Sequence, residues 1–210
     1  MAMQGVVGIP NTNAVDGTNP IVPQGKQGEL LKADLHGKWW SAAYRGRVFV
    51  GGTAAAGTTI PISSATAATF VLFNPLGSGI NVELISYDLG ITVVTSVASP
   101  VLLGIITGLV LAPTGLTALT ASPALLGGSS VAQAKLYSVA TLAAAATLFY
   151  TLGQITATNA TAGNALGPNF HYEFEGRIGL APGSLVHVCG TAAQTSPTTQ
   201  TFAWAEWPAP

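Results

Sequence analysis

The chain has 210 residues, of which only seven are Lys or Arg and eight are Asp or Glu, so charged residues make up 7% and the formal net charge is −1. An ordinary soluble domain has roughly 25% charged residues, and a surface so poor in charge is prone to self-association. Seven scattered cations do not form the basic stripe of a nucleic-acid-binding protein, and the 49% hydrophobic content excludes intrinsic disorder. Cys189 is the single cysteine, which excludes an intrachain disulfide.

The N-terminal 28 residues differ in composition from the rest of the chain. They are rich in Gly, Pro, Asn and Gln and have no sustained hydrophobic period, which predicts an extended N-terminal arm over residues 1–28, with a tail of no further role as the alternative. Residues 29–36 fit a helical turn or a strand equally well. The first ten residues lack the basic and apolar regions of a signal peptide, so we expect a protein made inside the cell.

From Arg47 onward, short runs of β-forming residues alternate with turn residues. The longest run covers 80–94, where period two places four side chains on one face: Ile85, Tyr87, Leu89 and Ile91. Residues 100–113 are strongly apolar, but only about 12 residues lie between the two prolines, and a membrane-spanning helix needs about 20. We therefore expect no contact with a membrane.

The second half of the chain continues the pattern of short strands. Residues 135–155 are predicted as two strands around an Ala-rich bend, although the alanines alone favour a helix. Residues 170–175 alternate between aromatic and polar side chains, 185–189 predict a buried strand, and 201–207 close the chain at period two. About eight to ten short strands separated by turns predict an all-β sandwich or barrel, with residues 29–210 as one domain.

No constellation of side chains predicts catalysis or metal binding. His171, Glu173 and Glu175 alternate on one strand face as metal ligands can, but a solvated sheet face is the interpretation we favour. His187 lies in an apolar run and is expected in the core. Cys189 has no activating neighbours, and carboxylates such as Glu206 are not paired for glycoside cleavage. We expect a protein that is not an enzyme and that binds no cofactor and no metal.

Aromatic residues gather near the two ends of the predicted domain. Exposed aromatics can form a carbohydrate-binding platform, but aromatics with arginines nearby are also what interface cores favour. We favour the second interpretation, in which these residues fasten the chain ends to the sandwich or to a neighbouring subunit. The candidate interface residues are Trp39, Trp40, Tyr44, Arg45, Arg47, Trp204 and Trp207.

Several stretches read together resemble a known group of proteins. They are residues 28–51 (GELLKADLHGKWWSAAYRGRVFVG), 73–79 (FNPLGSG), 180–184 (LAPGS) and 202–208 (FAWAEWP). Over roughly residues 28–208, the chain resembles uncharacterised virion structural proteins of tailed bacteriophages. The resemblance implies a virion component assembled in the host cytoplasm, with a jelly-roll-like antiparallel β-sandwich, and it supplies no catalytic residues.

These observations lead to one leading hypothesis and two alternatives. The leading hypothesis is a capsid decoration (cement) protein that forms a homo-oligomer, most simply a trimer, and binds the major capsid protein or another virion protein. One alternative is an adhesion module of a fibre or spike that binds glycan or a host receptor. The other is a subunit of a self-assembling tube or fibre.

Overall fold

The computed structural model describes residues 37–92, 99–155 and 170–209. Contacts divide the chain into two units, Met1–Ser41 and Ala42–Pro210, and the second unit contains all the described strands. The predicted arm over residues 1–28 and the segment 29–36 lie outside the described residues, so the predicted boundary at residue 28 stays a prediction.

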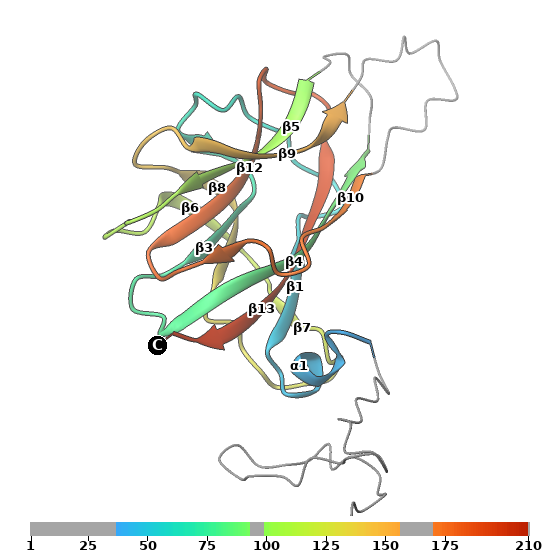
Figure 1. Ribbon diagram of the computed structural model, residues 1–210. Coiled ribbons are helices and arrows are strands. Elements are labelled where there is room, and N and C mark those ends of the chain that lie inside the picture. The colour runs from blue at the N-terminus through green and yellow to red at the C-terminus, as the bar shows by residue number, and fades with distance from the viewer. Residues whose placement is uncertain (1–36, 93–98, 156–169, 210) are drawn as a thin grey trace, which may run out of the picture. The chain divides into compact units, whose positions relative to one another are not determined.

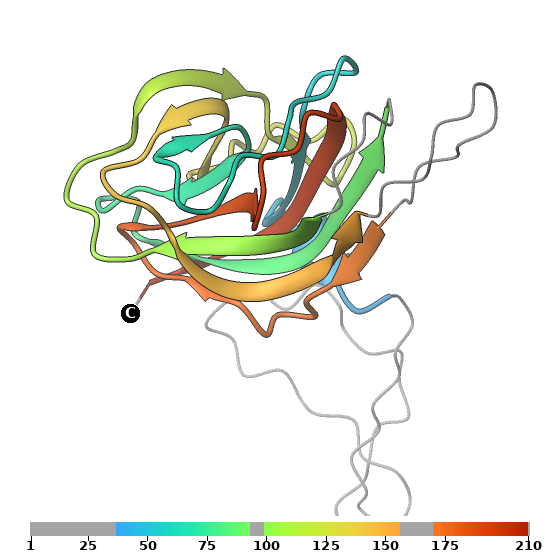
Figure 2. The same cartoon turned by 90° about the horizontal axis from the view of Figure 1, so that it is seen from above.

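Two antiparallel sheets form the second unit (Figures 1 and 2). The described elements are α1 (Trp40–Tyr44), β1 (Val48–Gly52), β2 (Ala67–Ala68), β3 (Val71–Asn74), β4 (Ile80–Ile91), β5 (Ser99–Ile106), β6 (Thr114–Leu119), β7 (Ser122–Pro123), β8 (Lys135–Thr141), β9 (Thr147–Ile155), β10 (Phe170–Glu173), β11 (Gly179–Leu180), β12 (Ser184–Gly190) and β13 (Thr198–Pro208). Sheet 1 has the order β10-β4-β13-β1-β7, with β11 beside β4. Sheet 2 has the order β2-β8-β3-β12-β5-β9, with β6 beside β8.

The pairing of eight of these strands is that of a jelly roll. The first strand pairs with the last (β1 with β13), the second with the next to last (β3 with β12), and the same nesting continues inward with β4–β10 and β5–β9. Within each nested pair, both strands belong to the same sheet. Nested antiparallel pairs rolled into two sheets are the jelly-roll architecture, and the expected jelly-roll β-sandwich is confirmed.

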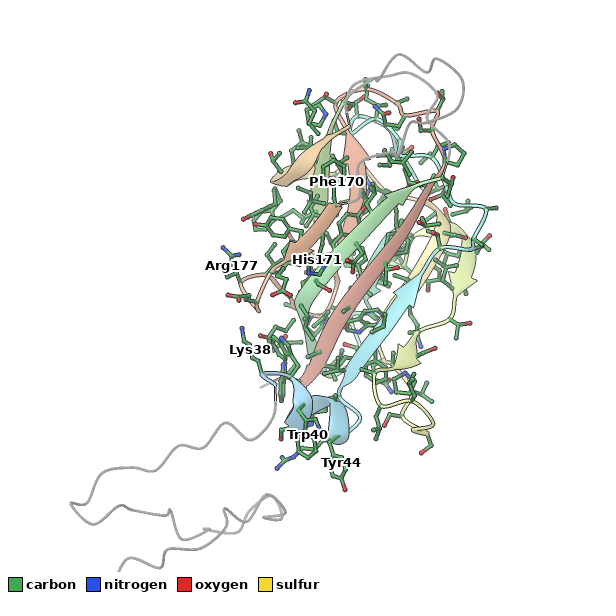
Figure 3. The ribbon with its side chains drawn as sticks, turned by 90° about the vertical axis from the view of Figure 1, so that its right-hand side faces the viewer. Lys38, Trp40, Tyr44, Phe170, His171 and Arg177 are labelled. Carbon is green, nitrogen blue, oxygen red and sulfur yellow. The ribbon has the colours of Figure 1, made fainter. Side chains whose placement is uncertain are left out.

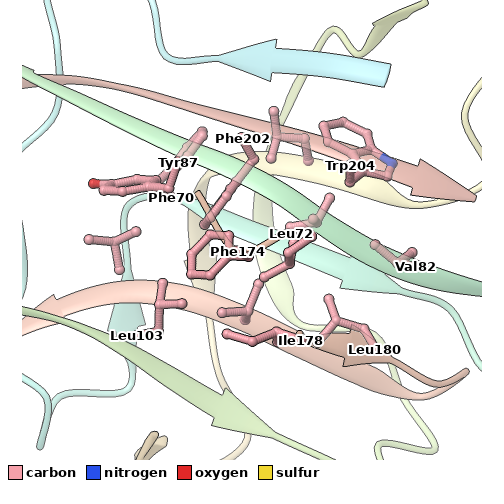
Figure 4. Close-up of a cluster of buried hydrophobic side chains, with 14 of the residues drawn as sticks. Phe70, Leu72, Val82, Tyr87, Leu103, Phe174, Ile178, Leu180, Phe202 and Trp204 are labelled. Atoms are coloured by element: carbon pink, nitrogen blue, oxygen red, sulfur yellow. The ribbon is translucent and has the colours of Figure 1, made fainter. Parts of the chain in front are cut away.

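The hydrophobic core lies between the two sheets (Figure 4). Phe70, just before β3, stacks on Phe202 of β13 with 5.0 Å between ring centroids, and Tyr87 of β4 lies 5.2 Å from Phe202. The Tyr87 hydroxyl donates to Gln200 Oε1 at 3.1 Å, so this buried polar atom is satisfied. Phe174 is also buried in this core, as the alternation in residues 170–175 predicts.

One predicted face in the longest strand is wrong. Tyr87 and Leu89 are buried in the core, but the other buried residues of β4 are Val82 and Leu84, and Ile85 lies outside the core clusters. The pairing of β4 with β13 shifts register between Ala203 and Trp204, so β4 contains one extra residue there. Such a β-bulge changes which side chains face the core.

Residues 107–146, which we call the insertion, lie between jelly-roll strands β5 and β9. Their strand β8 pairs with β3 of sheet 2, and their strand β7 pairs with β1 of sheet 1. The insertion therefore covers the neighbouring edges of both sheets, which would otherwise present unpaired backbone groups. The two strands predicted in residues 135–155 are confirmed as β8 and β9.

Residues 142–146 connect β8 to β9, and we call this segment the strap. The two strands lie toward opposite edges of sheet 2, with β3, β12 and β5 between them. Leu142 and Ala146 are buried, whereas Ala143–Ala145 between them are exposed. The strap helps to cover a second hydrophobic cluster that is separate from the main core: Ala68, Val71, Phe73, Ala140, Leu142, Ala146 and Leu185. The Ala-rich bend thus has a packing role, because small side chains let the chain cross close to the sheet.

Candidate assembly surface

Trp204 is a core residue: of the two roles considered for it, it packs within its own sandwich and not against a neighbouring subunit. Its side chain is fully buried, its ring centroid lies 6.1 Å from that of Phe49, and its indole Nε1 donates to Glu206 Oε1 at 3.1 Å. A side chain with no exposed surface cannot contact a partner. Period two in the closing strand places Trp204 and Trp207 on opposite faces, so only Trp207 remains a candidate.

Trp207 lies on the outer side of sheet 1, where it contacts residues from two other segments. Its indole Nε1 donates to Glu83 Oε2 of β4 at 2.6 Å, and the Arg47 guanidinium lies 5.3 Å from the centre of its ring. A cation above an aromatic face is attracted by the ring quadrupole. Through these contacts, Trp207 of β13 holds Arg47, which precedes β1, and packs against β4 of the same sheet.

The other predicted interface residues lie in or near α1. In the first unit, the Lys38 ammonium lies 5.2 Å from the centre of the Trp39 ring, and Trp40 is 40% exposed. In the second unit, Tyr44 is 58% exposed and Arg45 is also exposed. Aromatic and arginine side chains are enriched in the cores of interfaces. Trp39, Trp40, Tyr44 and Arg45 therefore stay candidates for contact with a partner.

Glu206 holds the insertion against β13. The carboxylate is buried and accepts the backbone N–H groups of Gln133 and Ala134 at 2.9 and 3.0 Å, in addition to the Trp204 indole. Three N–H donors around one buried carboxylate satisfy the charge. The role of Glu206 is therefore structural: it fixes the segment that leads into β8.

His171 lies on β10, at the edge of sheet 1 (Figure 3), and a carboxylate lies beside each of its ring nitrogens. Its Nδ1 lies 2.6 Å from Asp88 Oδ1 and its Nε2 lies 3.3 Å from Glu173 Oε1, and all three side chains are exposed. The hydrogen bond to Asp88 and then that to Glu173 raise the pKa of His171. Both ring nitrogens face acidic oxygens, so the arrangement stabilises an imidazolium rather than a catalytic base. The described residues contain no group of His, Cys, Asp and Glu side chains arranged to hold a metal ion.

His187 and Cys189 lie on β12, all of whose residues are buried. Burial lowers the pKa of His187 to about 4 and raises the pKa of the Cys189 thiol to about 11. The nucleophilic form of cysteine is the thiolate. A buried thiol with a raised pKa is unreactive, so neither side chain provides a nucleophile or base at neutral pH.

Charge is divided unequally between the two sheets. From Ala42 to Pro210 there are four basic and five acidic residues. Lys135 is the one charged residue in the strands of sheet 2, whereas the strands of sheet 1 and the segments beside them hold the other eight. These eight are Arg45, Arg47, Glu83, Asp88, Glu173, Glu175, Arg177 and Glu206.

Exposed apolar side chains concentrate in the insertion. Of the fourteen large hydrophobic side chains that are exposed in the described ranges, seven belong to residues 107–146: Val110, Leu111, Leu116, Leu125, Leu126, Val131 and Val139. Lys135 is the only charged residue of this segment. Large exposed apolar patches are typical of interaction sites, so this segment is a candidate assembly surface. The aromatic pattern did not point to this surface, although the uncharged run from residue 89 to residue 134 is visible in the sequence.

The first half of the strongly apolar residues 100–113 belongs to β5, whose Val101 and Leu103 are buried in the main core, and the second half begins the insertion. Among the described residues, no helix has both the length and the apolar character needed to cross a membrane. A scan against models of known protein families, a search of curated proteins and a search of solved structures each gave no match.

Proposed function

We propose that this chain is a structural subunit of a tailed-bacteriophage virion, namely a capsid decoration protein. In this proposal it works without enzymatic activity, forms a homo-oligomer, and stabilises the head lattice by binding the major capsid protein. The observation that carries the proposal is the apolar insertion on one side of a jelly roll, whose one charged residue is Lys135. Viral capsid domains use this fold, but lectins and cupins do so as well, so the fold alone does not select a function.

The physical basis of the proposed role is burial of apolar surface between subunits. Obligate interfaces bury roughly 2,000–5,000 Å² in total and are more apolar than transient ones. At about 25 cal/mol per Å² of apolar area, even part of such an interface exceeds the 5–15 kcal/mol stability of a typical domain. The low charge of the insertion removes the cost of desolvating charged groups.

Native mass spectrometry of the purified full chain at micromolar concentration tests this proposal. We expect a closed homo-oligomer, most simply a trimer. A well-behaved monomer would contradict the proposed mode of action. The virion assignment has its own test: the purified chain should sediment with phage heads that lack it, and its gene should lie beside that of the major capsid protein.

Exposed aromatic side chains near α1 favour one alternative, an adhesion module that binds glycan. Trp40 and Tyr44 are both exposed, as stacking on a sugar ring would require. Binding on a glycan array that is lost in Trp40→Ala would support this function. Retained oligomerisation without glycan binding would support the structural role.

A further inference from the structure

The insertion presents an apolar turn at its start. Val110 and Leu111 are 78% and 79% exposed. The residues that flank this turn on either side are held in place. On one side, the Leu109 amide donates to the Gly183 carbonyl at 2.8 Å, and on the other side Pro113 is buried. Two large apolar side chains are therefore held in water by an anchored backbone, and such pre-organisation lowers the entropy lost on binding.

The same insertion also forms an apolar groove. It has a volume of about 210 Å³ and is lined by residues from β6, from β8 and from the segment before β8. Alanines such as Ala118 and Ala132 leave the space open. The rest is lined by larger side chains: Leu119, Val131, Leu136, Tyr137 and the charged Lys135. Glu206 fixes one wall, because it accepts the backbone N–H groups of Gln133 and Ala134.

Charge indicates which partner fits these two surfaces. The insertion contains one cation, Lys135, and no acidic residue, so it matches neither a nucleic acid nor a strongly charged protein. A second copy of the chain brings a turn without charged residues and a groove whose one charged lining residue is Lys135. With a net charge of −1, two copies also repel each other very little.

We infer that the insertion joins copies of this chain head to tail, with the Val110–Leu111 turn of one copy packed into the groove between β6 and β8 of the next. Because turn and groove are different surfaces, the contact is heterologous, and a rotation that closes gives a ring such as a trimer. This inference rests on the proposed function and specifies the subunit contact that it uses.

Paired cysteine variants test the contact. Leu111→Cys and Ala118→Cys chains with different tags are co-expressed and mildly oxidised, and the native Cys189 does not interfere because it is buried. We expect a disulfide between the two kinds of chain and none when either variant is oxidised alone. If Leu111→Cys chains link to one another, the turns meet each other and the head-to-tail contact is overturned. If the wild type is an oligomer but the mixture forms no cross-link, the inference fails while the proposed function stands.

Variants that change affinity give an independent measurement. Val110→Ser combined with Leu111→Ser removes the apolar turn, and Ala118→Trp fills the groove. Each should raise the dissociation constant of the oligomer by on the order of tenfold or more in analytical ultracentrifugation. Val50→Ser on sheet 1 is the matched control, because it also removes an exposed valine. An equal effect of Val50→Ser and of the turn variant would overturn the assignment of the contact to the insertion.

Discussion

His187 lies opposite Gly104 of β5 and Val71 of β3, on the side of sheet 2 that the strap covers. A Cβ atom at position 104 would lie 2.6 Å from the His187 Nε2 and 2.9 Å from the Ala146 Cβ. The absence of a side chain at Gly104 therefore makes room for the imidazole ring. Within the described residues, neither ring nitrogen has a hydrogen-bond partner. A proton on this ring would be a buried charge, and the Val188 backbone offsets only part of the cost of burial.

His187 should make the protein less stable in acid. Burial lowers its folded-state pKa to about 4, whereas the unfolded chain takes up a proton near pH 6.5. The contribution is complete above about pH 6.5 and is lost as the pH falls toward about 4, by about 3 kcal/mol in total. Urea unfolding at a series of pH values measures this loss, and His187→Leu should remove most of it.

His171 provides the control for this pH dependence. Its pKa is raised by Asp88 and Glu173, so its contribution has the opposite sign: it is present at low pH and is lost as the pH rises. His171→Gln should therefore leave the acid loss in place. If His187→Leu keeps the full loss of stability between pH 6.5 and 4, another group causes it.

At the scale of elements, Glu206 links the insertion to the jelly roll by accepting two of its backbone N–H groups, and it also accepts the Trp204 indole N–H from its own strand. In Glu206→Gln, an amide NH₂ replaces one of the accepting oxygens and faces a donor. Hydrogen bonds to a charged group contribute about 1.5–3 kcal/mol each, so we expect a loss of about 2 kcal/mol. Urea unfolding at a fixed protein concentration measures it, because oligomer stability depends on concentration.

Glu83→Gln is the matched comparison for Glu206→Gln. Glu83 also accepts a tryptophan indole N–H, that of Trp207, but it is only partly buried and accepts no backbone N–H in the described structure. Its loss should be below about 1 kcal/mol. Equal losses in the two variants would show that the backbone contacts of Glu206 contribute little.

Local pattern explains which elements were predictable. β8 and β9 follow from β-forming residues on both sides of a short bend, and the faces of β10 and β13 follow from period two. Ile85 was misplaced because a bulge depends on the partner strand, and β4 meets β13 more than a hundred residues later in the chain. The nested pairing of the jelly roll is non-local in the same way, and only the resemblance indicated it.

The candidate surface was predictable only in part. Trp204 and Trp207 are three residues apart in one strand, so period two alone would have separated the core residue from the surface residue. The exposed turn at Val110 and Leu111 was not predictable, because apolar residues in an uncharged run normally indicate burial. Its exposure depends on the anchoring of Leu109 to Gly183, which is a contact between distant segments.

At the scale of the whole molecule, the division of charge defines two different surfaces. Sheet 1 and the segments beside it hold eight of the nine charged residues from Ala42 to Pro210, and the strands of sheet 2 hold only Lys135. Charged groups are costly to desolvate, whereas uncharged apolar surface gains free energy when it leaves water. In the proposed assembly through the insertion, the charges of sheet 1 would stay in solvent, where they would favour a soluble oligomer.

This division predicts how assembly depends on salt and temperature. If copies meet through the insertion, raising NaCl from roughly 0.05 to 0.5 M, which screens exposed charges, should change the dissociation constant less than about threefold. The association enthalpy should become more negative as temperature rises, because burial of apolar surface has a negative heat-capacity change. Analytical ultracentrifugation in a salt series and dilution calorimetry at several temperatures measure both quantities. Dissociation at high salt with little heat-capacity change would instead place the contact on the charged side chains of sheet 1.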